Sequence, residues 1–293
     1  MFDLVGRGAK ILKVASGYEF TEGPVFHRTG FMLFSDLPSE RILKYTISSS
    51  GGSPASGKIS VFREKSNRAN GLTFDHQGRL LTCETGPGRV TRTEKDGSIT
   101  VLADRYGAKR LSSPNDLVYN IDGSIYFSDM PRRNLPDASE RTNLPALYRI
   151  VRTQVPAAQY KIEKLSEECK RPNGVALGPK QRQLYIADST SRNIRVYAIR
   201  DDGTLEKGRV FADLASEEAG SPDGLKTDES GNVYCTGPEG VWVFSPTGKH
   251  LGTIVPPEMP SNCNWGRGFR GLYITARKSV YYVPTRVPGT RTY

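Results

Sequence analysis

Arg171-Pro172-Asn173-Gly174-Val175-Ala176 is one copy of a motif that recurs along the chain as a polar amide or acid, a small residue and an apolar run. The other copies are Glu22-Gly23-Pro24-Val25-Phe26, Asn70-Gly71-Leu72-Thr73-Phe74, Pro114-Asn115-Asp116-Leu117-Val118, Pro222-Asp223-Gly224-Leu225-Lys226 and a degenerate Asn262-Cys263-Asn264-Trp265. Most copies are about 45 to 60 residues apart, the period of β-propeller blades. The sequence therefore predicts an all-β protein with the fold of a six-bladed β-propeller.

Short apolar or alternating runs, separated by turn residues, follow each copy of the motif and are expected to form the strands of a blade. The sixth blade has only three such runs before the C-terminal tail. Residues 10–15 form one further strand candidate before the first motif and have no blade of their own. We expect this N-terminal strand to close the last blade and to cover its open edge. Residues 1–293 are then predicted to be a single six-bladed β-propeller domain.

Composition excludes several other classes of protein. Four widely spaced cysteines, Cys83, Cys169, Cys235 and Cys263, argue against a zinc ribbon or a disulfide framework. The net charge of +10 comes from scattered lysines and arginines without a basic cluster, so we expect no nucleic-acid partner. The first residues lack the apolar core of a signal peptide, and no apolar run approaches the ~20 residues that cross a bilayer. We expect a cytoplasmic protein without a membrane partner, whose oligomeric state stays open.

The polar residues of the motif point to a metal site. If each copy begins the innermost strand of a blade, six side chains converge on one end of the central channel, namely Glu22, Asn70, Asn115, Asn173, Asp223 and Asn262. Two carboxylates and several amides make an all-oxygen set that suits a hard divalent cation. The three histidines are not spaced as a zinc-binding pair. The alternative is that these residues only cap turns at the starts of strands.

A long insertion interrupts the third blade. Residues 130–141 are charged and punctuated by prolines, and they follow the second strand of that blade, so the connection is expected on the face where the innermost strands begin. We expect it to cover the channel mouth. Arg132, Arg133 and Arg141 would then attract an anionic ligand, and we predict that Arg132 and Arg133 contact the substrate, as does Asn70.

Four of the motif copies carry a resemblance to a known family. With Glu22-Gly23-Pro24, Ser113-Pro114-Asn115-Asp116, Arg171-Pro172-Asn173-Gly174 and Ser221-Pro222-Asp223-Gly224 in this order, the chain resembles the gluconolactonase and senescence-marker-protein (regucalcin-like) family, and within it the microbial gluconolactonase-like branch. The resemblance implies a divalent metal, commonly calcium, held at the channel mouth. By similarity its ligands would be Glu22, Asn173 and Asp223, with Asn115 as a further ligand or a substrate contact.

Two positions depart from the family pattern. Ser113 stands where animal members carry an arginine, and Thr85 follows Cys83-Glu84 where many microbial relatives have a histidine. The contacts that those residues make with sugar lactones therefore do not carry over to this chain, and the substrate preference is open.

The expected function is that of a metal-dependent hydrolase of lactones, either sugar lactones or related cyclic esters. Calcium is the first choice of metal, with magnesium, manganese and zinc as alternatives. The cation would polarise the carbonyl group, and Asp223 would activate or orient the attacking water. Two other functions stay open: a fluorophosphatase that hydrolyses phosphorus esters with a similar metal set, and a noncatalytic propeller that binds calcium or another ligand.

Overall fold

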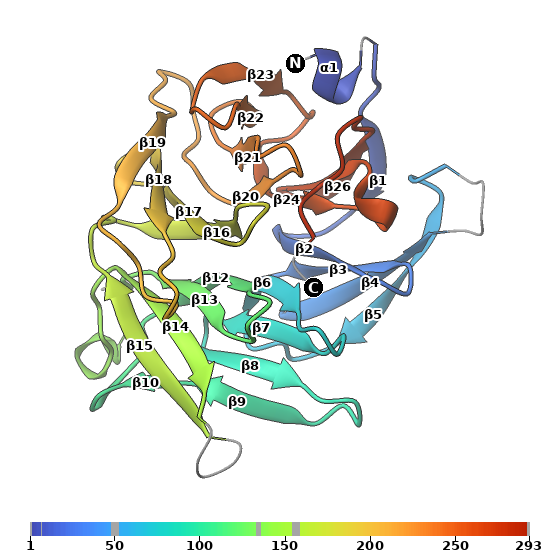
Figure 1. The fold of residues 1–293 in the computed structure, drawn as a ribbon. Coiled ribbons are helices and arrows are strands. Elements are labelled where there is room, and N and C mark those ends of the chain that lie inside the picture. The colour runs from blue at the N-terminus through green and yellow to red at the C-terminus, as the bar shows by residue number, and fades with distance from the viewer. Residues whose placement is uncertain (1, 7, 48–52, 133–135, 154–158, 292–293) are drawn as a thin grey trace.

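The computed structural model describes residues 2–6, 8–47, 53–132, 136–153 and 159–291. Its strands form six four-stranded antiparallel sheets arranged in a ring (Figure 1). This arrangement confirms the six-bladed β-propeller that the recurring motif predicts.

In blades 1 to 5 the strands follow chain order from the innermost to the outermost. Blade 1 consists of β2 (Thr21–His27), β3 (Phe31–Asp36), β4 (Arg41–Ile47) and β5 (Gly57–Arg63). Blade 2 consists of β6 (Ala69–Phe74), β7 (Leu80–Glu84), β8 (Arg89–Thr93) and β9 (Ile99–Ala103). Blade 3 consists of β12 (Pro114–Tyr119), β13 (Ile125–Asp129), β14 (Ala146–Arg152) and β15 (Tyr160–Ser166).

The second half of the ring repeats this order, except that the outermost strand of blade 6 comes from the N-terminus. Blade 4 consists of β16 (Pro172–Leu177), β17 (Gln183–Asp188), β18 (Asn193–Ala198) and β19 (Arg209–Asp213). Blade 5 consists of β20 (Leu225–Thr227), β21 (Val233–Thr236), β22 (Val241–Phe244) and β23 (His250–Ile254). Blade 6 consists of β24 (Pro260–Trp265), β25 (Leu272–Ala276), β26 (Ser279–Val283) and the N-terminal β1 (Leu12–Ser16).

A few short elements lie outside the blades. They are the helix α1 (Phe2–Val5), a ribbon of β10 (Arg105–Tyr106) and β11 (Lys109–Arg110), and the 3₁₀ turns η1 (Ala138–Glu140) and η2 (Arg267–Phe269). Within the described ranges, no helix has the length and apolar character needed to span a membrane.

The N-terminal strand closes the ring as the sequence predicts. β1 pairs antiparallel with β26, with Leu12 opposite Tyr282 and Ser16 opposite Ser279. The chain then continues into β2, where the hydroxyl of Thr21 donates to the backbone oxygens of Arg277 and Ser279 at 3.1 and 3.0 Å. The N-terminal and C-terminal parts of the chain are therefore paired in the sheet of blade 6. The hydrogen bonds of Thr21 join them a second time, between blade 1 and blade 6.

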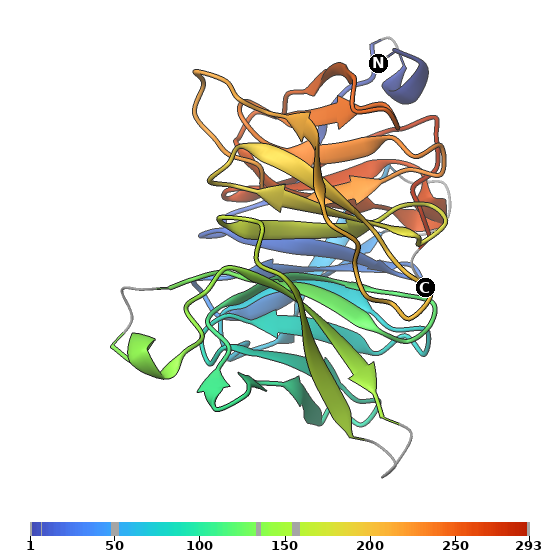
Figure 2. The same cartoon turned by 60° about the vertical axis from the view of Figure 1, so that its left-hand side comes forward.

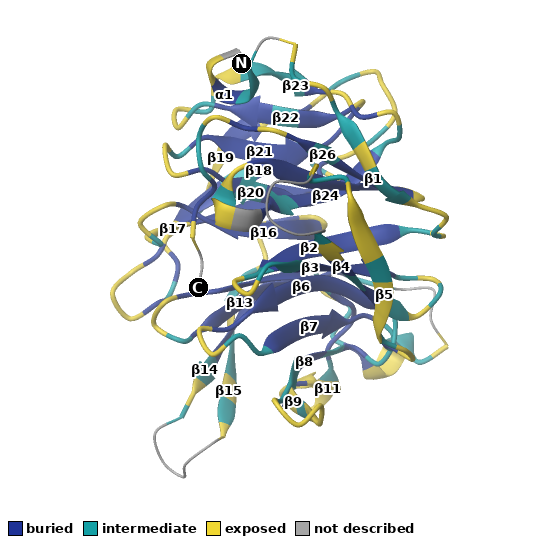
Figure 3. Ribbon diagram, turned by 90° about the vertical axis from the view of Figure 1, so that its right-hand side faces the viewer, coloured by how far each residue is buried: buried dark blue, intermediate teal, exposed yellow. Residues whose placement is uncertain are grey.

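The core lies between neighbouring blades. Figure 3 shows the innermost strands buried, whereas the outer strand β5 is largely exposed. One apolar cluster joins Val25 and Leu33 of blade 1 to Leu72 and Phe74 of blade 2. Because each blade buries its apolar surface against the next, the inner strands are held rigidly around the channel.

The small residue of the motif is explained by close contact between inner strands. A Cβ atom at Gly174 would lie 2.3 Å from the backbone oxygen of Asp223 in blade 5. One at Gly23, whose φ is +52°, would lie 2.2 Å from the backbone oxygen of Asn70 in blade 2. Only glycine tolerates such an approach. In the third copy Asp116 takes this place, and its carboxylate accepts hydrogen bonds from the backbone N–H groups of Leu117 and Val175 at 2.9 and 3.2 Å.

The two ends of the channel differ. The C-terminal segment lies across one end, near the centre of the ring in Figure 1, where Thr290 bonds Thr227 through its backbone N–H at 3.0 Å and its hydroxyl at 2.8 Å. The innermost strands begin at the other end, and Figure 2 shows η1 projecting on that side. We call this end the channel mouth.

Candidate functional site

An irregularity in the sheet occurs at nearly every copy of the motif. The pairing of the first and second strands shifts register at residues 22–25, 69–72, 114–117, 172–175 and 260–262, and β20 begins only after the motif of blade 5. Such bulges leave residues out of the hydrogen-bond ladder and change the direction of their side chains. The motif residues are thus free to contact the channel and the next blade.

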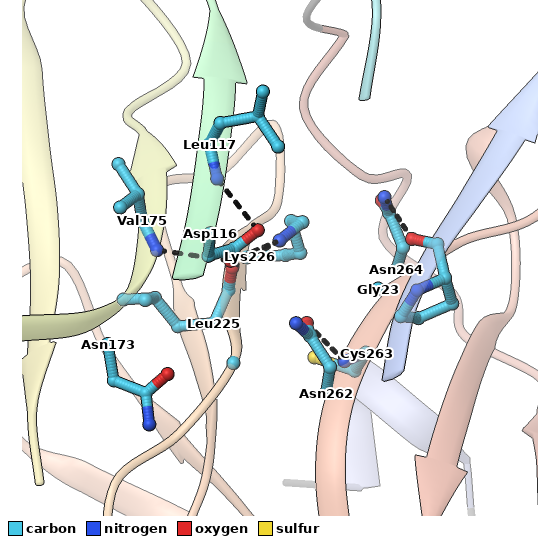
Figure 4. A network of polar contacts seen from close by, with 12 residues as sticks. Gly23, Asp116, Leu117, Asn173, Val175, Leu225, Lys226, Asn262, Cys263 and Asn264 are labelled. Carbon is cyan, nitrogen blue, oxygen red and sulfur yellow. Dashed lines mark hydrogen bonds and ion pairs between the residues drawn. The ribbon is translucent and has the colours of Figure 1, made fainter. Parts of the chain in front are cut away.

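The structure places all six predicted residues at the channel mouth, one from each blade. Glu22, Asn70, Asn173 and Asn262 are buried, whereas Asn115 and Asp223 are partly exposed. Figure 4 shows Asn173 and Asn262 on opposite sides of the channel, with Asp116 and Lys226 beside them. These residues therefore lie where the motif predicts. Their role in binding a metal or a substrate stays a prediction.

The two acids of the set repel each other. The Glu22 carboxylate accepts hydrogen bonds from the backbone N–H of Gly23 at 2.8 Å and from the Asn262 amide at 3.0 Å. Burial raises the pKa of Glu22 to about 7, and the charge of Asp116 contributes to that rise. Burial also raises the pKa of Asp223 well above its usual range, and the charges of Glu22 and Asp116 raise it further. A cation between these carboxylates would relieve both effects.

Two amide oxygens of the site have no partner. The Oδ1 atoms of Asn70 and Asn173 are buried and accept no hydrogen bond from the described residues. The amide nitrogen of Asn173 is held by the hydroxyl of Ser189 at 3.0 Å, which fixes the orientation of its side chain. These two oxygens therefore keep their lone pairs available to a ligand.

The chemistry of the donors fits a hard cation. The described residues contain no cluster of three or more His, Cys, Asp or Glu side chains that could hold a metal. The site instead combines the carboxylates of Glu22 and Asp223 with amide oxygens, a mixture that calcium accepts readily. Asn115 contributes a further amide, whose nitrogen is 3.6 Å from the sulfur of Met130. These residues can therefore hold a divalent cation.

The sequence analysis does not predict a contact between Lys226, which is partly buried, and Asp116, which is buried. The ammonium group of Lys226 donates to the backbone oxygen of Leu225 at 2.9 Å and lies 3.8 Å from the carboxylate of Asp116 (Figure 4). Lys226 therefore balances part of the negative charge that Glu22, Asp116 and Asp223 bring to the channel. The contact joins blades 3 and 5, and no local pattern in the sequence announces it.

A second set of acids holds the motifs in place. Asp188, at the end of β17, accepts hydrogen bonds from the backbone N–H groups of Lys170 and Arg171 at 2.8 and 3.0 Å, just before Asn173. The carboxylate of Asp129 accepts hydrogen bonds from the backbone N–H groups of residues 112 and 113, just before Asn115. The carboxylate of Asp36 accepts them from residues 19 and 20, just before Glu22. The recurring dipeptides Ser35-Asp36, Ser128-Asp129 and Ala187-Asp188 are the sequence signal for these acids, and the sequence analysis missed it.

A cavity of about 140 Å³ lies beside Asp223. Its lining includes Ser221 before the motif of blade 5 and Ser261 and Arg277 of blade 6. The cavity adjoins the carboxylate that we expect to act on water, so a small ligand bound there would lie next to Asp223.

The inserted loop corrects one expectation. Arg132 is partly exposed at the channel mouth, and Arg133 lies outside the described residues. Arg141, by contrast, is buried, donates to the backbone oxygens of Ser112 and Gly86 at 2.7 and 3.1 Å, and pairs with Asp137 at 2.9 Å. The prediction that Arg141 attracts a ligand is therefore wrong, because its guanidinium satisfies backbone carbonyls of the rim.

Comparison with known proteins agrees with this architecture. The chain is 29% identical to a gluconolactonase of Zymomonas mobilis, over 94% of this chain and 81% of that protein. It is 24% identical to lactonase drp35 of Staphylococcus aureus, over 80% of this chain and 69% of that protein. The solved structure of a gluconolactonase from Xanthomonas campestris is 30% identical, with a TM-score of 0.84 over 97% of this chain and 92% of that one. Residues 20–278 match the model of the SMP-30/gluconolactonase/LRE-like region, and the chain belongs to that family.

Proposed function

We propose that the protein hydrolyses lactones and requires a divalent cation, calcium being the first choice and magnesium, manganese and zinc the alternatives. The observation that carries the proposal is the meeting of two mutually repelling carboxylates, Glu22 and Asp223, with the unpartnered amide oxygens of Asn70 and Asn173. We assign the metal to Glu22, Asn173 and Asp223, with Asn115 as a further ligand or a substrate contact.

The residues of the chain have separate tasks in this proposal. A bound cation would supply a Lewis acid for the lactone carbonyl oxygen. Asp223 would accept a proton from water as the water oxygen attacks the carbonyl carbon, and would return that proton to the ring oxygen as the ring C–O bond breaks, giving a hydroxy acid. The carboxylate of Glu22, which accepts hydrogen bonds from Gly23 and Asn262, would chiefly serve as a ligand that holds the cation.

Gluconolactone is the first substrate to examine, because the relatives from Zymomonas mobilis and Xanthomonas campestris carry the name gluconolactonase. Asn70, Asn115, Arg132 and Arg133 stay our predicted substrate contacts. The cytoplasmic location, and the lack of nucleic-acid and membrane partners, rest on the sequence.

The proposal is tested by measuring hydrolysis of gluconolactone, aromatic lactones and aliphatic lactones. Each reaction is run after chelation and again with calcium, magnesium, manganese or zinc restored, and a fluorophosphate is assayed in parallel. We expect lactone turnover that chelation abolishes and one of these cations restores. Turnover of the fluorophosphate alone would replace the proposal with phosphoester hydrolysis, and tight calcium binding without any turnover would leave a noncatalytic propeller.

A further inference from the structure

Two arginines flank the proposed site on the side of blades 2 and 3. Arg68 immediately precedes β6, two residues before Asn70, and Arg132 follows β13, two residues after the Met130 that contacts the Asn115 amide at 3.6 Å. Each arginine is therefore attached to a segment that also carries a predicted substrate contact. Both arginines therefore lie next to the proposed site, but neither is a proposed metal ligand.

The two arginines lie at one patch of the rim, where the positive charges of Arg68 and Arg141 act on the guanidinium of Arg132. The Cδ atom of Arg68 lies 3.7 Å from where a Cβ would sit on Gly86, and the backbone oxygen of Gly86 accepts a hydrogen bond from Arg141. Arg141 also binds the backbone oxygen of Ser112, whose hydroxyl accepts the backbone N–H of Arg132 at 3.0 Å. Three arginines thus surround the same short stretches of backbone.

The acids of this patch are already engaged. Asp137 pairs with both Arg110 and Arg141, and Glu140 lies 3.5 Å from Arg110. Neither Arg68 nor Arg132 forms an ion pair with any acid in the described ranges, and the Nε atom of Arg68 is buried without a hydrogen-bond partner. Burial and the charges of Arg68 and Arg141 lower the pKa of Arg132. Two partly buried cations that repel each other are costly unless an anion joins them.

The backbone before β6 holds Arg68 in an unusual conformation. Asn67 and Arg68 have φ angles of +57° and +56°, in the left-handed region that costs a non-glycine residue roughly 1–2 kcal/mol. Glu84 holds the Asn67 amide at 3.0 Å, and Thr85 donates its hydroxyl to the backbone oxygen of Arg68 at 2.8 Å. Strained residues fixed in this way are concentrated at functional sites.

We propose that Arg68 and Arg132 together bind an anionic group of the substrate, so that the preferred substrate is an acidic lactone carrying a carboxylate, phosphate or sulfonate substituent. Guanidinium groups bind such oxyanions in pairs of parallel hydrogen bonds, which a lysine cannot reproduce. This inference rests on the proposed lactone hydrolysis and narrows its substrate class. Ring opening occurs at Asp223, and the arginines hold the substituent on the opposite side of the mouth.

The experiment compares neutral gluconolactone with 6-phosphogluconolactone and with glucarolactone, which carries a free carboxylate. The variants are Arg132→Gln, Arg132→Lys, Arg68→Gln and, as a charge-matched control, Lys180→Gln at an exposed turn between β16 and β17. We expect Arg132→Gln and Arg68→Gln to lower kcat/KM for both acidic lactones roughly tenfold or more through KM. The neutral lactone should change less than about threefold in Arg68→Gln and in the Lys180→Gln control, and in Arg132→Gln it should lose less than the acidic lactones do. Arg132→Lys should recover only part of the loss for the acidic lactones.

Inorganic phosphate supplies a second readout. It should inhibit hydrolysis of gluconolactone competitively in the wild type and in Lys180→Gln, and far more weakly in the two arginine variants. Equal losses for neutral and acidic lactones, or equal inhibition by phosphate in all variants, would overturn the inference.

If the wild type hydrolyses no lactone, the proposed function is refuted, but the anion site can still be tested by itself. Calorimetric binding of phosphate to the same variants then decides the role of the arginines. Binding that depends on Arg68 and Arg132 supports an anion site there, and binding that ignores them refutes it.

Discussion

At the scale of single residues, Asp223 and Glu22 carry different parts of the proposed chemistry. Both are acids of the channel mouth with raised pKa values, but only Glu22 has its carboxylate held by two hydrogen-bond donors, Gly23 and Asn262. Asp223 borders the cavity where a ligand fits. A ligand role and a base role can therefore be separated by substitution.

We predict that Asp223→Asn stays folded, binds calcium at millimolar concentrations and remains slow when calcium is saturating. The amide keeps an oxygen for the metal but cannot accept the proton, and a lost general base costs typically ~10² to 10⁴ in rate. Glu22→Gln should regain much of its activity as calcium is raised. Rates over a calcium titration check this, and full recovery of Asp223→Asn would reduce Asp223 to a ligand.

A second prediction concerns the stability of the metal-free protein. The pKa of Glu22 is raised from 4.5 to about 7 in the folded chain, so folding favours its protonated form. That contribution is fully present below pH 4.5 and is lost as the pH rises through 7. We therefore expect Tm in the presence of a chelator to fall between pH 5 and pH 8 more steeply in the wild type than in Glu22→Gln.

Calcium provides the control for this pH dependence. A bound cation stabilises the charged carboxylate, so saturating calcium should flatten the fall in Tm of the wild type. Parallel Tm curves for the wild type and Glu22→Gln without metal would show that Glu22 is not the group responsible.

The sequence predicts where the motif residues lie in the fold better than it predicts the contacts around them. Glu22, Asn70, Asn115, Asn173 and Asp223 belong to a repeated motif, so one correct alignment of the copies places them all. The Lys226–Asp116 contact and the burial of Arg141 depend on which segments meet across blades. The residue pattern within one segment does not predict such contacts between blades.

At the scale of the strand, the recurring motif has a structural task besides its chemical one. Gly174 sits where β16 passes Asp223, and its backbone N–H donates to the Asp223 oxygen at 3.2 Å. The glycine and the asparagine before it therefore have different tasks: Gly174 lets the inner strands approach each other, and Asn173 keeps a buried amide oxygen free for the proposed metal. Close packing of the inner strands and binding at the channel mouth both depend on these few residues. This explains why the copies of the motif resemble one another.

We predict that Gly174→Ala destabilises the protein by about 2–3 kcal/mol, because its Cβ would lie 2.3 Å from the Asp223 backbone oxygen and force the strands apart. The matched control is Gly178→Ala at the other end of β16. Its Cβ would come closest to the flexible side-chain oxygen of Gln183, at 3.2 Å, and would touch the Gln183 Cβ and the Tyr185 ring at 3.4 and 3.5 Å, so the cost should stay below about 1 kcal/mol.

Denaturant unfolding of both alanine variants measures these costs. Lactone hydrolysis should fall only for Gly174→Ala, since displacement of Asp223 disturbs the site. Equal stability of the two variants would contradict the packing explanation of the motif.

Strand prediction succeeds for the inner strands and for most outer strands, and it misses the outermost strand of blade 3. The inner strands are buried on both sides and read as apolar runs. β15, which the sequence analysis does not identify, exposes Lys161 and Lys164 on the outside of blade 3, and its other five residues are half-buried. This strand buries too little surface to leave a clear hydrophobic pattern. The two-residue strands β10 and β11 are shorter still.

At the scale of the whole molecule, the number of motif copies fixes the number of blades, and the strand count of the last blade predicts how the ring closes. The covering of the far end of the channel by the C-terminal segment could not be predicted in the same way. Its contacts, such as Thr290 with Thr227, are made by residues outside any repeat.

Ring closure leads to the final prediction. Deleting residues 1–15 removes most of β1 and exposes the backbone of β26 along the edge of blade 6. Blade 6 also packs against β2, so a loosened edge should weaken the contact between the first and last blades. We expect Tm to fall by more than about 10 °C, since each kcal/mol shifts the Tm of a large domain by only ~2–4 °C and several strand contacts are lost.

A shorter deletion separates the strand from the rest of the N-terminus. Removing residues 1–8 eliminates α1, whose Leu4 packs on blades 5 and 6 and accepts the backbone N–H of Arg286 at 2.7 Å, but leaves β1 intact. This variant should lose only part of that stability. The difference between the two melting temperatures measures the closing strand itself. Equal melting temperatures would mean that the ring is held by the contacts between inner strands, with β1 only covering an edge.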